Sequence, residues 1–200
     1  MKELWNKKFS RDGLLYGENA NDFIKENFTY IKKSGDILCL GEGEGRNAIF
    51  LAKNGLHVEA LDASDIGLAK LEKRARINNL EVTTHLCLFD KFKNPKLYDG
   101  IICSYMHLLK NEQESMFRKI TNLLKKDGFF IAEFFSIAQL NFQSGGPKNE
   151  DLLYDLQYVA KILSNLPCKI YKLSQEITYL NEGYGHNGEA SVIRVVLQKT

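Results

Sequence analysis

The sequence predicts an α/β protein with a doubly wound, mostly parallel seven-stranded sheet and an antiparallel C-terminal β-hairpin. Three observations carry this prediction. Short apolar runs alternate with amphipathic segments from residue 34 onward, which is the pattern of βαβ units that cover both faces of a sheet. The apolar run at 36–40 breaks into three alternating glycines and continues as a helix. The last two β-like runs have only a loop between them, so they must be antiparallel neighbours.

The chain begins with an aromatic-rich segment, residues 1–33, which we expect to form a helical lid over a ligand. A plainer alternative is that Trp5 and Phe9 only cap the edge of the core. A helix is predicted at about 21–28. The remaining residues, 34–200, are expected to form the α/β core of a single domain, because 200 residues suffice for one large core and no linker-like stretch divides them.

The core elements follow in order. The predicted parallel strands are 37–40, 57–61, 82–89, 99–104 and 129–135, and the predicted helices are 47–53, 64–78, 111–125 and 151–163. Ser64 is a plausible N-cap of the second core helix, and Asp127-Gly128 forms the turn after the third. The hairpin strands are predicted at 169–180 and 190–198, joined by a loop at 181–189.

The composition of the chain limits the kinds of partner that we expect it to bind. A formal net charge of +2, with 26% charged residues, gives no reason to expect a polyanion, and the short basic clusters are dispersed, so no nucleic-acid partner is predicted. The four cysteines form no CxxC pair, which favours free thiols in a reducing cytoplasm and no metal site. No stretch has the length and apolarity of a signal peptide or a membrane span, so we expect a cytoplasmic protein without a membrane partner.

The glycine loop alone is a weak functional signal, but two aspartates strengthen it. Gly41, Gly43 and Gly45 have a spacing that differs from the dinucleotide fingerprint G-x-G-x-x-G. Asp62 ends the second strand about 20 residues later, where a carboxylate can accept hydrogen bonds from ribose hydroxyls. Asp90 follows the third strand and can accept from an adenine amino group. The alternatives are an ordinary turn aspartate and an ordinary loop residue.

These residues resemble the class I S-adenosylmethionine-dependent methyltransferases, and more narrowly their small bacterial tellurite-resistance-type and thiopurine-type branch. The matching segments run along nearly the whole chain: Trp5 to Phe9, Tyr16-Gly17, Ala20 to Phe23, Gly41 to Ala48, Leu61 to Ser64, Gly67 to Lys70, Phe89-Asp90, Tyr98 to Gly100, His107-Leu108, Gly145 to Lys148, and Glu182-Gly183 with Gly185-His186. The Gly-Arg-Asn and Gly-His elements are the most specific of them.

The resemblance implies a Rossmann-like fold, S-adenosyl-L-methionine as cofactor and S-adenosyl-L-homocysteine as product. The glycines would receive the methionine half, Asp62 the ribose and Asp90 the adenine. Cys39 stands where many relatives carry an acidic residue, which leaves Glu42 or a water to replace it. The full implied cofactor set is Tyr16, Gly41, Glu42, Gly43, Gly45, Arg46, Asp62, Ala63, Phe89, Asp90, Ser104 and Tyr105, with Tyr16 and Arg46 near the methionine carboxylate and Ser104-Tyr105 near the sulfonium.

Three residues are candidates for catalysis. His107 follows the fourth strand and His186 lies in the hairpin loop, so either could accept a proton from the methyl acceptor. Arg194 could orient an anionic or soft acceptor. Each could instead be structural, as we expect for His57 and His85.

The sequence therefore predicts a methyltransferase that acts on a small molecule, such as a thiol, a metalloid oxyanion or a similar soft nucleophile, as a monomer or weak homodimer. Two other functions stay open. One is a cofactor-binding module without turnover, which Cys39 encourages. The other is a nicotinamide-dependent oxidoreductase, against which the glycine spacing and the terminal hairpin both speak.

Overall fold

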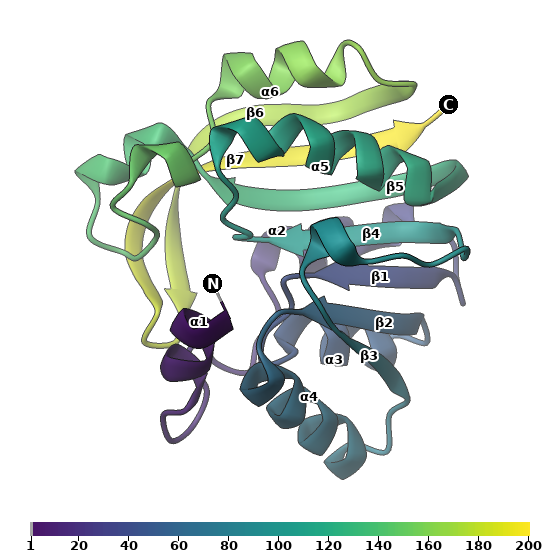
Figure 1. Ribbon diagram of the computed structural model, residues 1–200, viewed down its shortest axis with the longest axis vertical. Coiled ribbons are helices and arrows are strands. Elements are labelled where there is room, and N and C mark those ends of the chain that lie inside the picture. Colours follow the sequence, from purple (N-terminus) through teal and green to yellow (C-terminus); the bar gives the residue numbers. More distant parts are fainter. Residues whose placement is uncertain (1) are drawn as a thin grey trace.

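A seven-stranded sheet with strand order β3-β2-β1-β4-β5-β7-β6 forms the centre of the molecule (Figure 1). The structure is a computed structural model and describes residues 2–200. Strands β1 to β5 pair in parallel, whereas β7 is antiparallel to both β5 and β6. The predicted fold class is confirmed, including the antiparallel C-terminal pair.

Most strands follow the apolar runs closely, but β5 begins at Leu124, before its predicted start at 129, because Leu124 already pairs with Tyr98 of β4 and the predicted helix ends at Leu123. Their bounds are β1 Asp36–Leu40, β2 His57–Asp62, β3 Val82–Leu86, β4 Tyr98–Ser104, β5 Leu124–Phe135, β6 Cys168–Glu182 and β7 His186–Lys199. Central β1 and β4 are almost wholly buried, as expected for strands with helices on both faces. The third strand ends before its predicted bound at 89, because residues Phe89–Lys91 form a 3₁₀ turn.

Helices cover the sheet on both faces. They are α1 Lys2–Phe9, α2 Asp22–Asn27, α3 Arg46–Lys53, α4 Asp65–Ile77, α5 Lys110–Leu123 and α6 Leu156–Leu163. Residues of α5 and α6 pack into one apolar core, and residues of α2, α3 and α4 pack into another on the opposite face. Figure 1 shows α5 and α6 in front of the sheet, with α2 and α3 behind it.

Two N-caps decide where helices begin. Ser64 caps α4 as predicted, since its hydroxyl accepts from the N–H of Gly67 at 3.0 Å. The last helix begins later than its predicted start at 151. Asp155 caps it by accepting from the N–H of Tyr158 at 2.7 Å, while residues Glu150–Leu152 form a separate 3₁₀ turn.

The C-terminal hairpin is longer and its loop shorter than predicted. β6 and β7 stay paired up to Glu182 and His186, so only residues 183–185 form the turn. This hairpin projects past the end of the sheet and descends toward α1 (Figure 1). Its tip meets the N-terminal segment, because the N–H of Gly185 donates to the carbonyl of Leu15 at 2.9 Å.

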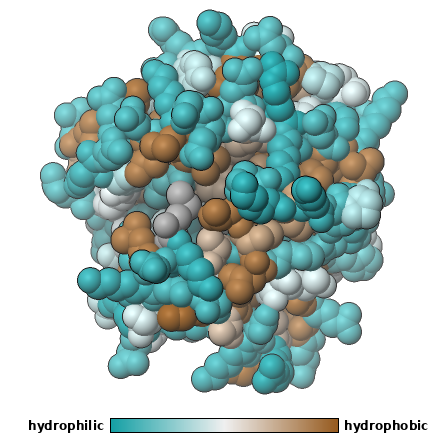
Figure 2. Space-filling view, viewed as in Figure 1, coloured by the Kyte–Doolittle hydropathy of each residue, from teal (hydrophilic) through white to brown (hydrophobic). Residues whose placement is uncertain are grey.

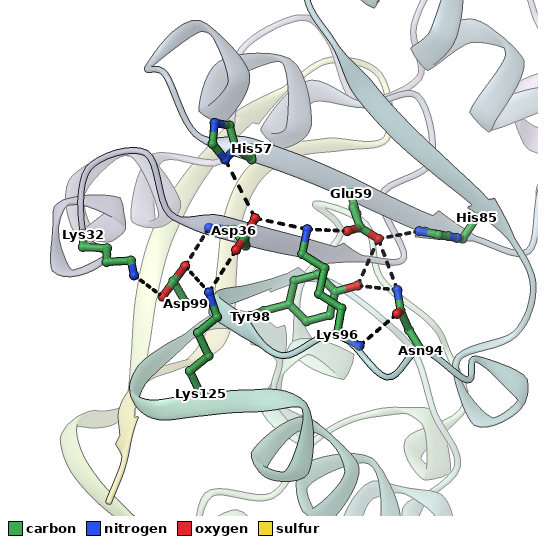
Figure 3. A network of polar contacts seen from close by, with 10 residues as sticks. All are labelled: Lys32, Asp36, His57, Glu59, His85, Asn94, Lys96, Tyr98, Asp99 and Lys125. Atoms are coloured by element: carbon green, nitrogen blue, oxygen red, sulfur yellow. Dashed lines mark hydrogen bonds and ion pairs between the residues drawn. The ribbon is translucent and has the colours of Figure 1, made fainter.

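A network of ion pairs joins β1, β2 and β4, beginning at the amino ends of β1 and β4 and reaching His85 of β3 (Figure 3). Asp36 at the start of β1 pairs with Lys125 at 2.9 Å and with Lys96 at 3.1 Å, and Lys125 also bonds Asp99 on β4. His85 pairs with Glu59 at 2.7 Å, which agrees with the structural role expected for it. Asp36 and Asp99 lie at the start of β1 and β4, so this part of the network is at the opposite end of the strands from the glycine loop.

Candidate active site

A cavity of about 410 Å³ opens at the carboxyl ends of β1, β2 and β4. This is the edge of an open α/β sheet at which ligands bind, and the volume lies in the usual range for a small-molecule site. Apolar side chains gather in the middle of the face drawn in Figure 2, between α5 and α4. The lining includes Tyr16, Gly41, Glu42, Gly43, Arg46, Asp62, Ala63, Phe89, Asp90, Ser104, Tyr105, His107 and His186. Most of the residues implied by the sequence thus meet in one place.

The glycine loop joins β1 to α3 through left-handed backbone. Gly41 and Gly43 have φ angles of +60° and +56° and line the cavity. A Cβ on Gly43 would lie 2.7 Å from Cζ of Phe9, so the loop and α1 touch directly. Gly45 is the exception among the residues implied for the cofactor, because it lies outside the lining. A Cβ there would meet Leu71 at 2.1 Å, so Gly45 serves the packing of α3 against α4.

Asp62 braces the glycine loop while lining the cavity. Its Oδ2 accepts from the N–H of Gly43 at 2.8 Å and its Oδ1 from the N–H of Ser64 at 2.7 Å. Burial raises the pKa of this carboxyl, although the backbone donors oppose the shift. A carboxylate has about four lone-pair directions, so both oxygens keep acceptor capacity for a ligand.

Asp90 lies at the rim of the cavity. Its side chain is 62% exposed and pairs with Lys91 at 3.0 Å. The hydrogen bond from Lys91 lowers the pKa of Asp90 below its ordinary value. It can therefore reach a ligand only at the mouth of the site.

Glu42 is a buried carboxyl group in the lining of the cavity, whereas Cys39 of β1 lies outside the lining. Cys39 is fully buried in the core on the α3 side of the sheet. The Oε1 atom of Glu42 accepts from the N–H of Ala48 at 2.7 Å, at the N-terminus of α3. Burial raises the pKa of Glu42 to about 7. Burial also raises the pKa of the Cys39 thiol, and the nearby Glu42 charge adds to that shift. Glu42 therefore places a carboxyl group in the loop, beside the N-terminus of α3.

Glu182 joins two cavity-lining residues, Arg46 and His186, to Asn21 behind the cavity. It accepts from Nη2 of Arg46 at 3.0 Å, from the amide of Asn21 at 3.0 Å, and lies 2.9 Å from Nδ1 of His186. Burial alone would raise the pKa of Glu182, but the Arg46 charge and the His186 and Arg46 hydrogen bonds outweigh it and hold the pKa at about 2. Glu182 is therefore ionised at neutral pH.

His186 is a buried histidine with a defined orientation. Its ring lies among those of Tyr16, Tyr105 and Phe135, with centroid separations of 4.4, 4.5 and 5.0 Å. Because Nδ1 faces an ionised carboxylate, Nδ1 carries the proton and Nε2 holds a free lone pair. Burial lowers the pKa of His186, despite the bond to Glu182, so the ring is neutral at pH 7.

His107 lies between two other rings. Trp5 and Phe135 flank it at centroid separations of 6.3 and 6.1 Å, nearly parallel to it. Burial lowers the pKa of His107 to about 3. The residue therefore forms a neutral wall of the cavity at physiological pH.

The structure corrects the expectation for Arg194. This residue lies outside the cavity lining, where its Nε donates to Glu133 at 2.6 Å and its Nη1 to Glu176 at 2.8 Å. The reason is the burial of Glu133, which is 1% exposed and needs a cation. Glu133 in turn accepts from the hydroxyl of Tyr105 and the amide of Asn21. Arg194 therefore supports the cavity wall without facing an acceptor.

The N-terminal segment closes one side of the cavity. Trp5 and Phe9 of α1 belong to the lining. Asn6 fastens α1 to α4, because its amide bonds Asp65 at 2.6 Å and accepts from the Ser64 hydroxyl at 2.6 Å. Lid-like coverage of the site thus rests on specific polar contacts.

Sequence reasoning missed the buried polar residues behind this cavity. The sequence assigns no role to Glu182, Glu133 or Asn21, although all three are buried beside the cavity. Asn47 was missed too, although its amide donates to Ser104 at 2.9 Å and its Oδ1 accepts from the N–H of Asn21. The one available signal was the presence of charged or amide residues inside apolar strand and helix patterns.

Comparison with known proteins agrees with this geometry. Residues 37–128 match the model of a methyltransferase domain. The ubiquinone biosynthesis O-methyltransferase of Rickettsia prowazekii is 32% identical over 105 residues, which cover 50% of this chain and 41% of that protein. The chain therefore matches only about two fifths of the length of this curated relative.

Solved structures share the whole fold. TehB from Haemophilus influenzae superposes with a TM-score of 0.74 at 15% identity and covers 100% of this chain and 67% of its own. Magnesium protoporphyrin IX methyltransferase from Synechocystis, with bound S-adenosylmethionine, gives 0.71 at 16% identity and covers 100% and 95%. An S-adenosylmethionine-dependent methyltransferase from Clostridium acetobutylicum gives 0.69 at 17% identity and covers 98% and 96%. The chain therefore has the Rossmann-like fold of S-adenosylmethionine-dependent methyltransferases, and its residues 37–128 match a methyltransferase domain.

Proposed function

We propose that this protein is an S-adenosyl-L-methionine-dependent methyltransferase that acts on a small molecule and releases S-adenosyl-L-homocysteine. The observation that carries the proposal is a single cavity onto which the glycine loop, Asp62 and His186 all open. Similar structures that contain S-adenosylmethionine and S-adenosylhomocysteine support it.

The residues present fit this cofactor. Gly41 and Gly43 allow close approach to the backbone, and Asp62 offers acceptors for ribose hydroxyls. Arg46 is buried, and its Nη1, although 2.9 Å from Glu182, has no well-aligned hydrogen-bond partner among the described residues. That N–H suits a carboxylate, while the Glu42 carboxyl suits an amine.

The bound cofactor supplies an electrophilic methyl group on a positively charged sulfur. The chain's own contribution begins with positioning and exclusion of water. Trp5, Phe9 and Tyr16 cover the side of the cavity nearest α1, and Tyr105 is fixed at the end of β4 by Glu133. Holding two reactants in a near-attack geometry in a dry site accounts for several kcal/mol of a barrier, on the order of 7–11 in favourable cases.

His186 is the group best placed to take a proton. Its Nε2 lone pair can accept the hydrogen of an X–H acceptor, because Glu182 holds the other ring nitrogen as a donor. Glu182 then stabilises the imidazolium that forms. We assign His107 to shaping the cavity, since its pKa of about 3 makes it a poor base at neutral pH.

The proposal also covers the domain organisation, the cellular location, the oligomeric state and the family branch of the protein. We propose a single cytoplasmic domain, with residues 1–33 as lid and 34–200 as core, that works as a monomer or weak homodimer and without nucleic acid. The tellurite-resistance-type branch belongs to this proposal, supported by the similarity to TehB. Within residues 2–200, no helix is long and apolar enough to span a bilayer.

Cofactor binding and turnover test the proposal separately. S-adenosylhomocysteine should bind in calorimetry and raise the melting temperature, and Asp62→Ala should weaken binding at least about tenfold. Asp151→Ala is the matched control, because Asp151 is exposed and lies outside this cavity. Methyl transfer is then followed as S-adenosylhomocysteine release over thiols, phenols and amines. Absence of binding at millimolar cofactor would disprove the proposal.

A further inference from the structure

We infer that the methyl acceptor is an uncharged molecule, because the chain pairs the buried cations beside the acceptor internally. This inference rests on the proposed function and narrows it. We call the end of the cavity lined by Trp5, Tyr16, Tyr105, His107 and His186 the acceptor chamber. Tyr105 follows β4 and His186 begins β7, whereas Asp62 ends β2, on the other side of β1 in the strand order.

The chamber is walled by rings. His107 faces Trp5 on one side and Phe135 on the other, and Phe135 stacks on Tyr105 at a centroid separation of 4.5 Å. Tyr16 closes the wall against His186. Such a surface favours an apolar or polarisable ligand and offers few hydrogen bonds.

The first buried cation, Arg46, is neutralised where it stands. Its guanidinium carbon lies 5.9 Å from the Tyr16 ring and 6.0 Å from the Tyr105 ring, directly beside the chamber. Both terminal nitrogens lie within 3.0 Å of a Glu182 oxygen. An anionic acceptor would therefore meet a carboxylate together with the arginine.

The second cation, Arg194, is neutralised in the same way. Glu133 and Glu176 hold it, and the Tyr105 hydroxyl reaches the Glu133 carboxylate. The charged groups behind the chamber thus comprise the buried Arg46 and the partly buried Arg194, with the buried carboxylates of Glu133 and Glu182 and the partly exposed one of Glu176. The balance is neutral or negative and leaves no attraction for an oxyanion.

The histidines add no charge either. Burial keeps both His107 and His186 neutral at pH 7. Besides Arg46, the lining cation is Lys119, whose ammonium donates to the backbone carbonyls of Phe89 and Asp90, away from the chamber. Lys8 lies beside the chamber, with Nζ 4.5 Å from the centroid of the Trp5 ring. It lies outside the lining, so it can draw an anion to the mouth but cannot pair with one inside.

These charges set the specificity. We assign the Nη1 N–H of Arg46 to the cofactor carboxylate. An anionic acceptor that enters the chamber therefore gives up its hydration without gaining a cationic partner, which is strongly unfavourable. A neutral X–H group exchanges one hydrogen bond to water for one to Nε2 of His186. In the reaction the X lone pair forms the new bond to the methyl carbon, the electron pair of the broken carbon–sulfur bond stays on sulfur, and the X–H proton moves to Nε2.

Matched acceptors test the inference on the wild-type protein. Two pairs differ mainly in charge: 2-mercaptoethanol against mercaptoacetate, and 4-hydroxybenzyl alcohol against 4-hydroxybenzoate. We expect KM for the neutral member of the pair that is methylated to be at least about tenfold lower, since an unpaired buried charge costs at least this much. An equal or lower KM for the anion, or transfer to selenite or tellurite but to neither neutral compound, overturns the inference.

Calorimetry with S-adenosylhomocysteine distinguishes a failure of the proposed function from a failure of the acceptor assignment. If the cofactor product fails to bind, the proposed function fails, and this inference with it. If it binds and the anions are preferred, only the acceptor assignment fails. Transfer to none of the compounds, with the cofactor product bound, counts against both turnover and the acceptor class.

A charge variant gives a second, independent readout. Glu182→Gln leaves Arg46 unpaired, so the KM ratio of anion to neutral acceptor should fall at least about fivefold, even though overall activity drops. Lys8→Gln is the matched comparison, because it removes a cation outside the lining and should leave this ratio within about twofold. A ratio that responds to Lys8→Gln but not to Glu182→Gln would show that the rim selects charge, contrary to the inference.

Discussion

Removal of the Glu182 carboxylate should destabilise the fold more than removal of any half-exposed carboxylate in the same network. In Glu182→Ala, Arg46 remains 7% exposed with its ion partner gone, and Asn21 and His186 each lose an acceptor. Breaking one side of a buried pair costs about 3–5 kcal/mol, because the other charge stays buried. For a chain of this size that corresponds to a melting temperature lower by about 6–20 °C.

The assay is urea unfolding at pH 7 with Glu176→Ala as control. Glu176 is 29% exposed, and its partner Arg194 keeps Glu133, so the control should lose less than about 1 kcal/mol. Glu182 has a pKa of about 2 in the folded protein and about 4.3 when unfolded, so its contribution is present above pH 4.3 and is lost as the pH falls toward 2. A loss for Glu182→Ala no larger than that of the control would refute the reasoning.

Three further outcomes follow from the site and its cover. His186→Gln should lower kcat/KM by at least about 100-fold and remove the fall in activity below pH 6.5, whereas His107→Gln should keep that fall in a kcat/KM profile. His107→Phe should reduce the loss of unfolding free energy between pH 7 and pH 5, measured by urea unfolding. The pKa of His107 is about 3 in the folded protein and about 6.5 in the unfolded chain, so protonation favours the unfolded chain as the pH falls below 6.5. An unchanged pH dependence of the unfolding free energy would contradict this. Gly183→Ala should cost about 1–3 kcal/mol and speed dissociation of S-adenosylhomocysteine in stopped-flow, since φ is +64° and the new Cβ would lie 2.6 Å from N of Gly17. Gly13→Ala, with φ of +74° but open space around it, is the control for backbone strain alone, and equal effects on dissociation would count against the docking role of the hairpin tip.

The order of strands and helices could be predicted because it depends on local patterns. Apolar runs flanked by turns defined β1, β2 and β4 within one or two residues. The hairpin loop was predicted too long, because Asn181, Glu182 and Glu189 have the composition of a loop although they pair in the ladder. Pairing with a partner strand overrode local propensity there.

The cavity-facing residues of the glycine loop and Asp62 were predictable for the same reason, since each follows a strand at a fixed spacing. The role of Arg194 was not. Its partner Glu133 is 61 residues away in the chain and becomes its neighbour only through the β5–β7 register. A side chain that could bind an acceptor and one that neutralises a buried carboxylate look the same in a sequence.

The ion-pair network at the amino ends of the strands has a consequence for how this protein can change over time. It joins β1, β2 and β4 on the side of the strands away from the cavity (Figure 3). Substitutions in the acceptor chamber therefore leave these contacts intact, and the lineage can explore new acceptors without first losing the scaffold. We expect a library randomised at Trp5, Tyr16 and His107 to retain far more folded members than one randomised at Asp36, Glu59 or Asp99.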